Sequence, residues 1–275
     1  MTAEATEQSA LDELLAVLDV RQTATDSFTG PNQPVPTQRL FGGQLLGQAL
    51  VACGRTVPPA LTIRSLHAYF LRPGDPLVPV HYTVHRFRSD GPSTIRHAEA
   101  TQDGTVVFSA FAAFHETTHL PTTSTTCPKP AAPTEGPSEF PFHTGPTARP
   151  GQPIELRAAT SGATGVWLRP TARLPDDPLL HHALLAHLSD ISLLRAAVRE
   201  HRRETGTAQG DAASLDHAMW FHGVPRLRDW LWYATTNPSA HGSRGLGLGR
   251  MIDQSGTLLA TVGQEGLFRP RRQAR

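Results

Sequence analysis

The sequence predicts an α+β fold in which one chain of 275 residues holds two copies of a helix wrapped by an antiparallel sheet. Three observations predict this fold. Proline divides the chain near its middle, because nine of the 24 prolines fall between Pro121 and Pro153. Each side of this stretch carries a helical pattern followed by strand patterns. Two short motifs also recur on both sides in the same order. A chain of this length can bury a large core.

The elements of the first half follow from apolar spacing. Leucines recur at helical intervals from Leu11 to Leu18, and a second helix is expected directly after Phe41-Gly42-Gly43. Strand patterns follow, and the last two are joined by Asp103-Gly104, a dipeptide typical of hairpin turns. The expected strands cover residues 61–70, 78–84, 93–101 and 105–114.

The second half repeats this order. A helix is expected from about Pro178 to Arg199, with Ser255-Gly256 at the hairpin position that Asp103-Gly104 holds in the first half. The expected strands cover residues 154–159, 166–173, 213–222, 230–236, 239–253 and 257–268. We therefore predict an N-terminal unit over residues 1–117, a Pro/Thr-rich linker over 118–153 and a C-terminal unit over 154–275.

Two local matches indicate a duplication. The stretch Ser65–Phe70 (SLHAYF) resembles Ser214–Phe221 (SLDHAMWF), apart from small insertions. The strand that ends Phe114-His115-Glu116 parallels the one that ends Gly263-Gln264-Glu265. Each match is short, but their common order is typical of an internal repeat.

Composition excludes several classes of function. Apolar residues make up 39% of the chain and charged residues 18%, with a net charge of +1, so no nucleic-acid partner is expected. No apolar run reaches the roughly 18 residues of a membrane span. The acidic stretch Met1–Glu7 lacks the features of a secretory signal, which makes the cytoplasm the expected location. Only two cysteines and one lysine occur, so neither a disulfide framework nor a lysine-based covalent mechanism is expected.

Longer motifs resemble a known family. Phe41–Leu50 (FGGQLLGQAL) and His67–Asp75 (HAYFLRPGD) closely resemble the first half of acyl-CoA thioesterase II. Ser214–His222, Ser243-Arg244-Gly245 and Gln264-Glu265-Gly266 resemble its second half. The likeness runs from about Leu11 to Arg269, except through the linker. It implies a double hotdog fold, in which two helix-in-sheet units are fused side by side, and hydrolysis of acyl-CoA to free acid and coenzyme A.

The resemblance also implies three catalytic residues. The family's Asp, its Ser or Thr hydroxyl and its Gln match Asp190, Ser214 and Gln264 in this chain. Thioester hydrolysis needs an aimed water, a group that takes its proton and donors for the oxyanion. Asp190 lies beside the apolar stripe of its helix, so we expect desolvation to raise its pKa toward neutrality, which suits a general base. The Ser and Gln groups can orient water without carrying charge.

Other residues near these motifs have two interpretations each. Asp216 is expected on the same strand face as Ser214, either supporting the site or holding His217. His67, at the corresponding place in the first half, is either a substrate contact or a structural histidine. Arg244 contacts coenzyme A phosphates or a neighbouring carboxylate. Gly42-Gly43 allows close backbone approach at a helix start, either for structure or as part of an oxyanion hole.

Rival chemistries find less support. The chain has no Gly-x-Ser-x-Gly elbow and no His-Glu-x-x-His motif, so neither a serine hydrolase nor a metal site is expected, and no cofactor is implied. A hydratase or dehydratase on the same fold, or a non-enzymatic acyl-CoA binder, remains an alternative. We expect a homo-oligomer, because sheets of this kind leave a face or an edge to cover.

Overall fold

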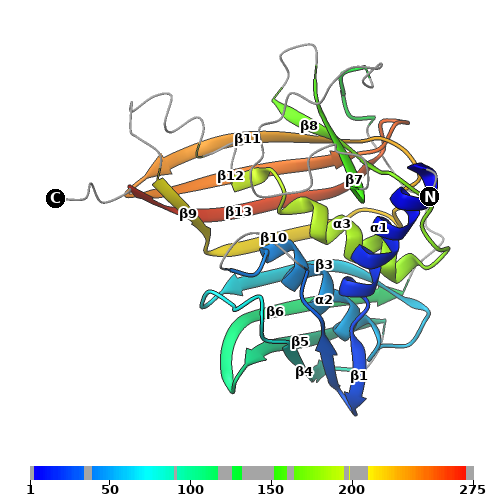
Figure 1. Cartoon of the computed structure of the whole chain (residues 1–275), viewed down its shortest axis with the longest axis vertical. Helices are drawn as coiled ribbons and strands as arrows, with labels where there is room; N and C mark the ends of the chain where they lie inside the picture. Colours follow the sequence, from blue (N-terminus) through cyan, green and yellow to red (C-terminus); the bar gives the residue numbers. More distant parts are fainter. Residues whose placement is uncertain are drawn as a thin grey trace.

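The protein is described from a computed structural model of the chain, over residues 3–33, 39–89, 92–116, 126–131, 152–159, 164–194, 198 and 210–270. Its main feature is a 13-stranded sheet in which neighbouring strands are antiparallel (Figure 1). The strand order is β1-β2-β4-β5-β6-β3-β10-β13-β12-β11-β8-β7, and β9 pairs with β13. The first six strands of this order come from the first half of the chain and the others from the second.

Over its described residues, the N-terminal half contains two helices and six strands. The predicted leucine stripe of the first helix is buried, with Leu11 and Leu18 fully enclosed. The second helix is buried on all sides from Gly43 to Cys53, so it forms the centre of this half. The elements are α1 (Ala3–Leu18), β1 (Arg21–Ala24), β2 (Ser27–Gly30), α2 (Gly42–Gly54), β3 (Leu61–Phe70), β4 (Val80–Arg88), β5 (Ser93–Gln102) and β6 (Thr105–Glu116).

The C-terminal half repeats the pattern around a third helix. Asp177 caps the start of this helix by accepting a hydrogen bond from Leu179 N–H at 2.8 Å, and Pro178 occupies the first turn, where its missing N–H costs nothing. The elements are β7 (Ile154–Ala158), β8 (Gly165–Pro170), α3 (Pro178–Ser189), β9 (Gly210–Ser214), β10 (Asp216–Phe221), β11 (Leu231–His241), β12 (Arg244–Ile252) and β13 (Leu258–Pro270).

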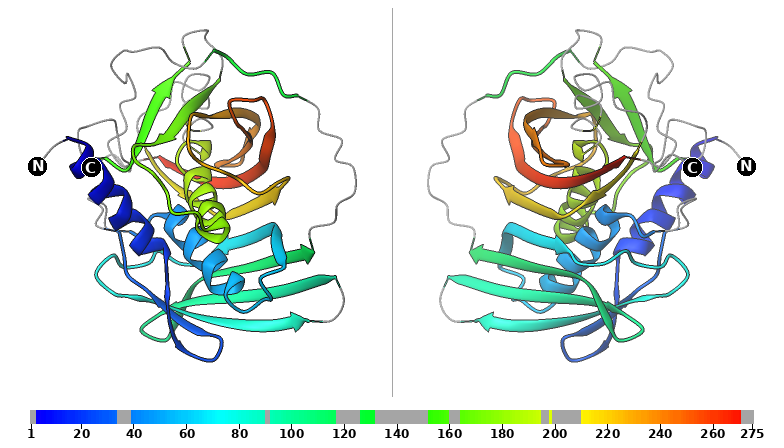
Figure 2. Two further views of the ribbon diagram at one scale, coloured as in Figure 1. Left: turned by 90° about the vertical axis from the view of Figure 1, so that its right-hand side faces the viewer. Right: turned by 90° about the vertical axis from the view of Figure 1, so that its left-hand side faces the viewer.

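Strands β3 and β10 join the two halves into one sheet. Five residue pairs connect them, from Asp216 opposite Tyr69 to Trp220 opposite Ser65. The sheet curves around α2 and α3, which lie against each other on its inner face (Figure 2). This arrangement confirms the predicted double hotdog.

Glycines let α2 and α3 approach closely. A Cβ atom on Gly43 would lie 2.4 Å from the carbonyl oxygen of His187, and one on Gly47 would lie 3.0 Å from that of Ala183. Since Gly43 and Gly47 are four residues apart, they share one face of α2. The start of α2 therefore touches the end of α3.

Several predicted boundaries differ from the structure. The strands expected at 230–236 and 239–253 are instead the hairpin β11–β12, whose turn lies at Gly242-Ser243 with positive φ at both residues. Asn237-Pro238 is only an irregularity within β11, because the pairing with β12 resumes at Ser239. The short hairpin β1–β2 was not predicted. Most of the predicted linker lies outside the described residues.

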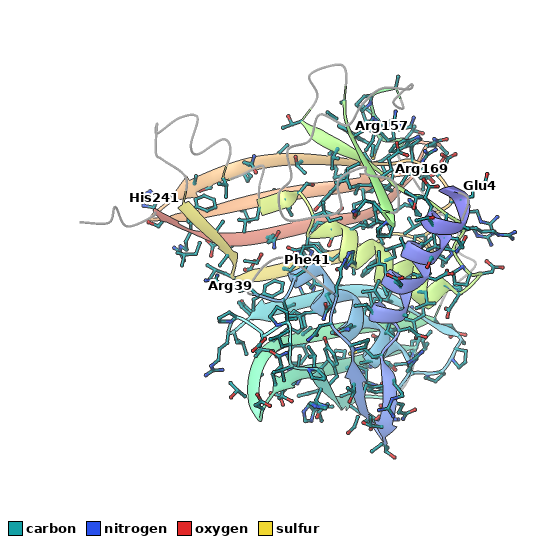
Figure 3. All side chains as sticks on the ribbon, in the orientation of Figure 1. Glu4, Arg39, Phe41, Arg157, Arg169 and His241 are labelled. Carbon is teal, nitrogen blue, oxygen red and sulfur yellow. The ribbon has the colours of Figure 1, made fainter. Side chains whose placement is uncertain are left out.

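A second, smaller apolar cluster lies near the far edge of the sheet. It gathers Trp167, Trp230 and Trp232 between β8, β11 and the adjoining loop. The guanidinium groups of Arg157 and Arg169, labelled in Figure 3, lie 5.6 and 4.5 Å from the ring of Trp230, distances at which cation–π attraction operates. No helix among the described residues is long and apolar enough to cross a membrane.

Candidate active site

Asp190 lies at the C-terminal end of α3 rather than inside a helix. The predicted helix to Arg199 is interrupted here, because α3 ends at Ser189 and Asp190 is its C-cap residue. The chain tightens at this point, with Ile191 N–H donating to the Leu188 carbonyl at 3.1 Å. This geometry turns the carboxylate of Asp190 away from the helix axis and toward the start of α2 and strand β13.

Gln264 connects Asp190 with Ser214. Its side-chain Nε2 donates to Asp190 Oδ1 at 2.6 Å and to Ser214 Oγ at 2.8 Å. Gln264 itself is fully buried on β13, whereas Asp190 and Ser214 are partly exposed. The structure therefore brings the three predicted residues into one hydrogen-bonded chain.

The direction of these hydrogen bonds defines what the site still offers. Because a carboxylate can only accept, the amide nitrogen of Gln264 must face Asp190. Ser214 Oγ accepts from this amide, which leaves its O–H free to donate. The amide oxygen Oε1 is buried and has no hydrogen-bond partner among the described residues. Among the described residues, the site thus retains a hydroxyl donor for a water or a substrate carbonyl, beside the carboxylate of Asp190.

The N-terminal half also reaches this site. Gly43 N–H, in the first turn of α2, donates to Asp190 Oδ2 at 2.9 Å. A Cβ atom on the preceding Gly42 would lie 2.7 Å from the same oxygen. The N–H groups of a first helical turn have no partner within the helix and carry a partial positive charge. Both oxygens of Asp190 therefore accept N–H hydrogen bonds. The raised pKa expected for this carboxyl group from desolvation stays a prediction.

A buried polar network supports the residue before Asp190. Ser189 Oγ donates to the Ala186 carbonyl at 2.7 Å, so it accepts from His217 Nε2, 2.8 Å away. Tyr233 donates its hydroxyl to the Ser189 carbonyl at 2.7 Å. Burial lowers the pKa of His217 to about 3, and burial followed by the charge of Asp190 raises the pKa of Tyr233. Both side chains stay neutral, and they fix the end of α3.

Apolar side chains line the sheet beside Asp190, Ser214 and Gln264, which together are called the triad. Gly266 lies opposite Ser214 in the pairing of β13 with β9, and Gly247 lies opposite Gln264 in that of β12 with β13. A Cβ on Gly247 would lie 2.9 Å from Leu193, and one on Gly266 would overlap Leu194. The two leucines that follow Asp190 therefore rest directly on the backbone of the sheet and form an apolar wall.

The structure places two predicted substrate contacts on the outer face of the sheet. His217 points inward to α3, so its neighbour Asp216 points outward, and Asp216 Oδ1 accepts from the Glu265 N–H at 2.7 Å. The expectation that Asp216 shares a face with Ser214 is wrong, because Leu215 interrupts the strand between β9 and β10. His67 is exposed and packs edge-on against Trp220 at 5.2 Å. Neither side chain faces the triad.

Arg244 also lies on the outer face, beside the turn between β11 and β12. Its guanidinium is 3.7 Å from the carboxylate of Glu265, and it is more than half exposed. Glu265 therefore provides the neighbouring carboxylate that one of the two sequence-based interpretations of Arg244 expected. Contact with coenzyme A phosphates stays a prediction.

Gly43 is the functional residue for which sequence reasoning assigned no partner. The pair Gly42-Gly43 did signal close backbone approach at a helix start. What it approaches depends on how α3 crosses α2, and no local pattern encodes that crossing.

Comparisons with known proteins show which family and fold this chain resembles. The family model described as "Acyl-CoA thioesterase" matches residues 150–267, and the model "Acyl-CoA thioesterase N-terminal domain" matches residues 31–115. Human acyl-coenzyme A thioesterase 8 is 32% identical over 94% of this chain and 89% of its own length. A crystal structure of an acyl-CoA thioesterase II from Mycobacterium marinum is 36% identical, with a TM-score of 0.74 over 94% of this chain and 98% of that one. A hot dog fold protein from Alicyclobacillus acidocaldarius, 19% identical, aligns with a TM-score of 0.68 over 92% of this chain and 97% of that one, a likeness of fold.

Proposed function

The chain belongs to the acyl-CoA thioesterase family, and on that premise we propose that it hydrolyses fatty or related acyl-CoA by direct attack of water. One observation supports this mechanism above the others. It is the hydrogen-bonded chain from Asp190 through Gln264 to Ser214, in which the buried amide of Gln264 holds the base and the water-orienting hydroxyl in place and so positions the water indirectly. No covalent acyl-enzyme is required.

The proposed reaction has two steps. A water held by Ser214 and Asp190 attacks the thioester carbonyl carbon while Asp190 takes its proton. The tetrahedral intermediate then collapses, the bond between carbon and sulfur breaks, and the proton on Asp190 passes to the departing coenzyme A thiolate. The products are the free acid and coenzyme A, and Asp190 returns to its ionised form.

We place one oxyanion donor, the Gly42 N–H, at the start of α2. Gly43 N–H is engaged by Asp190, while Gly42 N–H, one residue earlier, has no hydrogen-bond acceptor among the described residues. Free N–H groups at a helix start suit a developing negative charge. The acyl chain would then leave the carbonyl along the apolar wall of Leu193 and Leu194.

Release of coenzyme A tests this function. A thiol reagent follows the free thiol while acyl-CoA substrates of increasing chain length are supplied. Hydrolysis of at least one of them supports the enzyme and reports its preferred acyl length. A folded protein that binds acyl-CoA and releases no thiol from any chain length would instead be the non-enzymatic binder.

Ser214 offers a graded test of the water-orienting role. Ser214→Ala is expected to lower kcat about 10-fold, because the water loses one of its fixed partners. Ser214→Thr keeps the hydroxyl and should retain kcat within about threefold. Rates of coenzyme A release at saturating substrate measure both. Equal losses in the two variants would show that the hydroxyl is not what matters at this position.

We also propose that the outer face of the sheet binds a second copy of the chain. On this face, one residue from each of seven neighbouring strands forms a continuous row of pairing partners. None of these seven residues is an Asp, Glu, Lys or Arg. Large apolar side chains on or beside this row are exposed, including Phe87 at 65% and Trp220 at 43%. The row consists of His85, His97, Phe111, His67, Ala218, Gly263 and Leu248.

The double variant Phe111→Glu/Trp220→Glu is expected to be a monomer of about 30 kDa, because like charges would meet across the pairing face. Light scattering after size-exclusion chromatography measures the mass. Val224→Glu is the matched control, since Val224 is exposed to the same degree but lies in a loop outside the row. A monomeric wild type, or an unchanged mass in the double variant, would exclude this face as the interface.

A further inference from the structure

Ser189, the residue immediately before Asp190, is held by a tyrosine from the sheet. The hydroxyl of Tyr233, on β11, donates to the Ser189 carbonyl at 2.7 Å. The last carbonyls of a helix have no partner within it, and this one is the final carbonyl of α3. Both residues are completely buried, so the two groups meet in the protein interior. The contact therefore fixes the peptide plane that leads into Asp190.

The sheet is shaped to admit this tyrosine. The ring of Tyr233 passes over Gly249 of the neighbouring strand β12, where a Cβ atom would lie 2.4 Å from the ring and 3.0 Å from the hydroxyl oxygen. A side chain at Gly249 would therefore push the ring off this path. Tyr233 also pairs within the sheet on both sides, with Val166 of β8 and Met251 of β12, which restrains its backbone. The sheet thus sets how far Tyr233 reaches toward the end of α3.

A second contact holds Ser189 from another strand. Its Oγ lies 2.8 Å from Nε2 of His217 on β10, so β10 engages its hydroxyl and β11 its carbonyl. The carboxylate of Asp190 has little freedom to absorb a shift of the preceding peptide. Its two oxygens are engaged by Gly43 N–H at 2.9 Å and by Gln264 Nε2 at 2.6 Å. A rotation of that peptide would therefore disturb the carboxylate itself.

The first repeat contains a corresponding tyrosine with a different partner. Tyr82 is the third residue of β4, as Tyr233 is of β11, and each of these strands follows the strand that joins the two halves. Tyr82 is also buried, and its hydroxyl also donates to the central helix of its half, to Gln48 Oε1 at 2.8 Å. Gln48 lies in the middle of α2, whereas Ser189 ends α3. Only the tyrosine of the second repeat reaches the residue next to the candidate base.

We propose that Tyr233 is a positioning residue for hydrolysis, which holds the end of α3 so that the carboxylate of Asp190 stays in place to take a proton from water. This inference rests on the proposed role of Asp190 as the base. Without the hydroxyl, the Ser189 carbonyl would lose this donor and the peptide before Asp190 would be free to turn. Small displacements of a catalytic group are costly in rate. Because Tyr233 is fully buried, it does not contact the substrate.

Tyr233→Phe removes the hydroxyl and keeps the ring. It is expected to lower kcat about 10-fold while KM stays within about twofold, because a misplaced base slows the reaction without weakening substrate binding. Coenzyme A release over a range of acyl-CoA concentrations separates the two constants. A wild-type kcat in folded Tyr233→Phe would overturn the inference.

Tyr82→Phe is the matched control. It removes the equivalent hydroxyl of the first repeat and also deprives a buried acceptor of a donor, so it should lower the melting temperature about as much as Tyr233→Phe. Its kcat should remain at the wild-type value. An equal loss of kcat in the two variants would assign the effect to stability in general and would contradict the positioning role.

Gly249→Ala disturbs the same contact from the neighbouring strand. Its methyl group would displace the ring of Tyr233, so kcat should fall about as much as in Tyr233→Phe. In the double variant kcat should fall no further, because the contact is already lost, whereas the melting temperature should fall further. Losses of kcat that multiply would count against the inference. Should Tyr233→Phe not fold, Gly249→Ala decides alone: a reduced kcat supports the inference and a wild-type kcat overturns it.

Asp190→Asn, assayed in the same series, separates this inference from the proposed function. If Asp190→Asn remains active, the base assignment fails and the positioning role fails with it. If Asp190→Asn is inactive while Tyr233→Phe is fully active, only the positioning role is refuted. Loss of kcat in both, with Tyr82→Phe active, supports both proposals.

Discussion

Asp190→Asn is expected to lower kcat by about 10²- to 10⁴-fold, the range that general acid–base catalysis supplies. Asparagine has nearly the shape of aspartate but cannot take a proton from water. It also offers a single acceptor oxygen, so it cannot satisfy both Gly43 N–H and Gln264 Nε2 as the carboxylate does. Coenzyme A release under saturating substrate measures the loss, and circular dichroism checks the fold.

Asp216→Asn is the control for this substitution. Asp216 lies two residues after Ser214 and accepts a backbone N–H from Glu265, but its carboxylate faces away from the triad. The asparagine oxygen can still accept that bond, so kcat should stay near the wild-type value. Activity that survives in Asp190→Asn and disappears in Asp216→Asn would transfer the base to Asp216.

Gly43→Ala is expected to lower kcat by about 10²-fold, because small displacements of a catalytic group are costly. The new methyl group would lie 2.4 Å from both the His187 carbonyl oxygen and the ring of Phe41. Neither the helix backbone nor the packed ring can yield without moving α2 away from α3. Overpacking of this kind costs about 1–3 kcal/mol of folding stability, partly offset by the better helix propensity of alanine.

Gly47→Ala separates the two effects of Gly43→Ala. Gly47 lies one turn further along the same face of α2, where a methyl group would meet Leu18 and the carbonyl of Ala183. The free energy of unfolding, measured with denaturant, should fall in both variants. The large loss of kcat should be confined to Gly43→Ala. A comparable loss of kcat in Gly47→Ala would mean that helix spacing in general, rather than the contact with Asp190, controls activity.

Sequence patterns predicted the elements whose signals are local. Leucine spacing located α1, and Asp103-Gly104 located the β5–β6 hairpin, where both residues adopt positive φ. The β11–β12 hairpin was missed because its turn, Gly242-Ser243, interrupts a stretch that otherwise reads as strand. The preceding Asn237-Pro238 gives a stronger turn signal, but the strand continues through it with shifted register.

The residues of the candidate site were predicted from the family resemblance. The geometry of the site depends on contacts between residues that are distant in the sequence. Periodicity alone extended α3 to Arg199 and put Asp190 beside a helical stripe. In the structure the helix ends at Ser189, which is hydrogen-bonded by His217 from strand β10 and by Tyr233 from strand β11. Strict alternation along β10 likewise misplaced Asp216, because a single irregular residue at Leu215 reverses the faces that follow.

The two repeats carry different residues at the positions that correspond to Asp190 and Gln264. The C-cap of α3 is Asp190, but the C-cap of α2 is Arg55, which forms an ion pair with Asp19. His115, in the strand motif of the first half, corresponds to Gln264. The first repeat therefore lacks a base and an amide at the equivalent places, and it contributes its helix start instead. Under the proposed mechanism, the two repeats together form one active centre per chain, and neither repeat holds all of its groups.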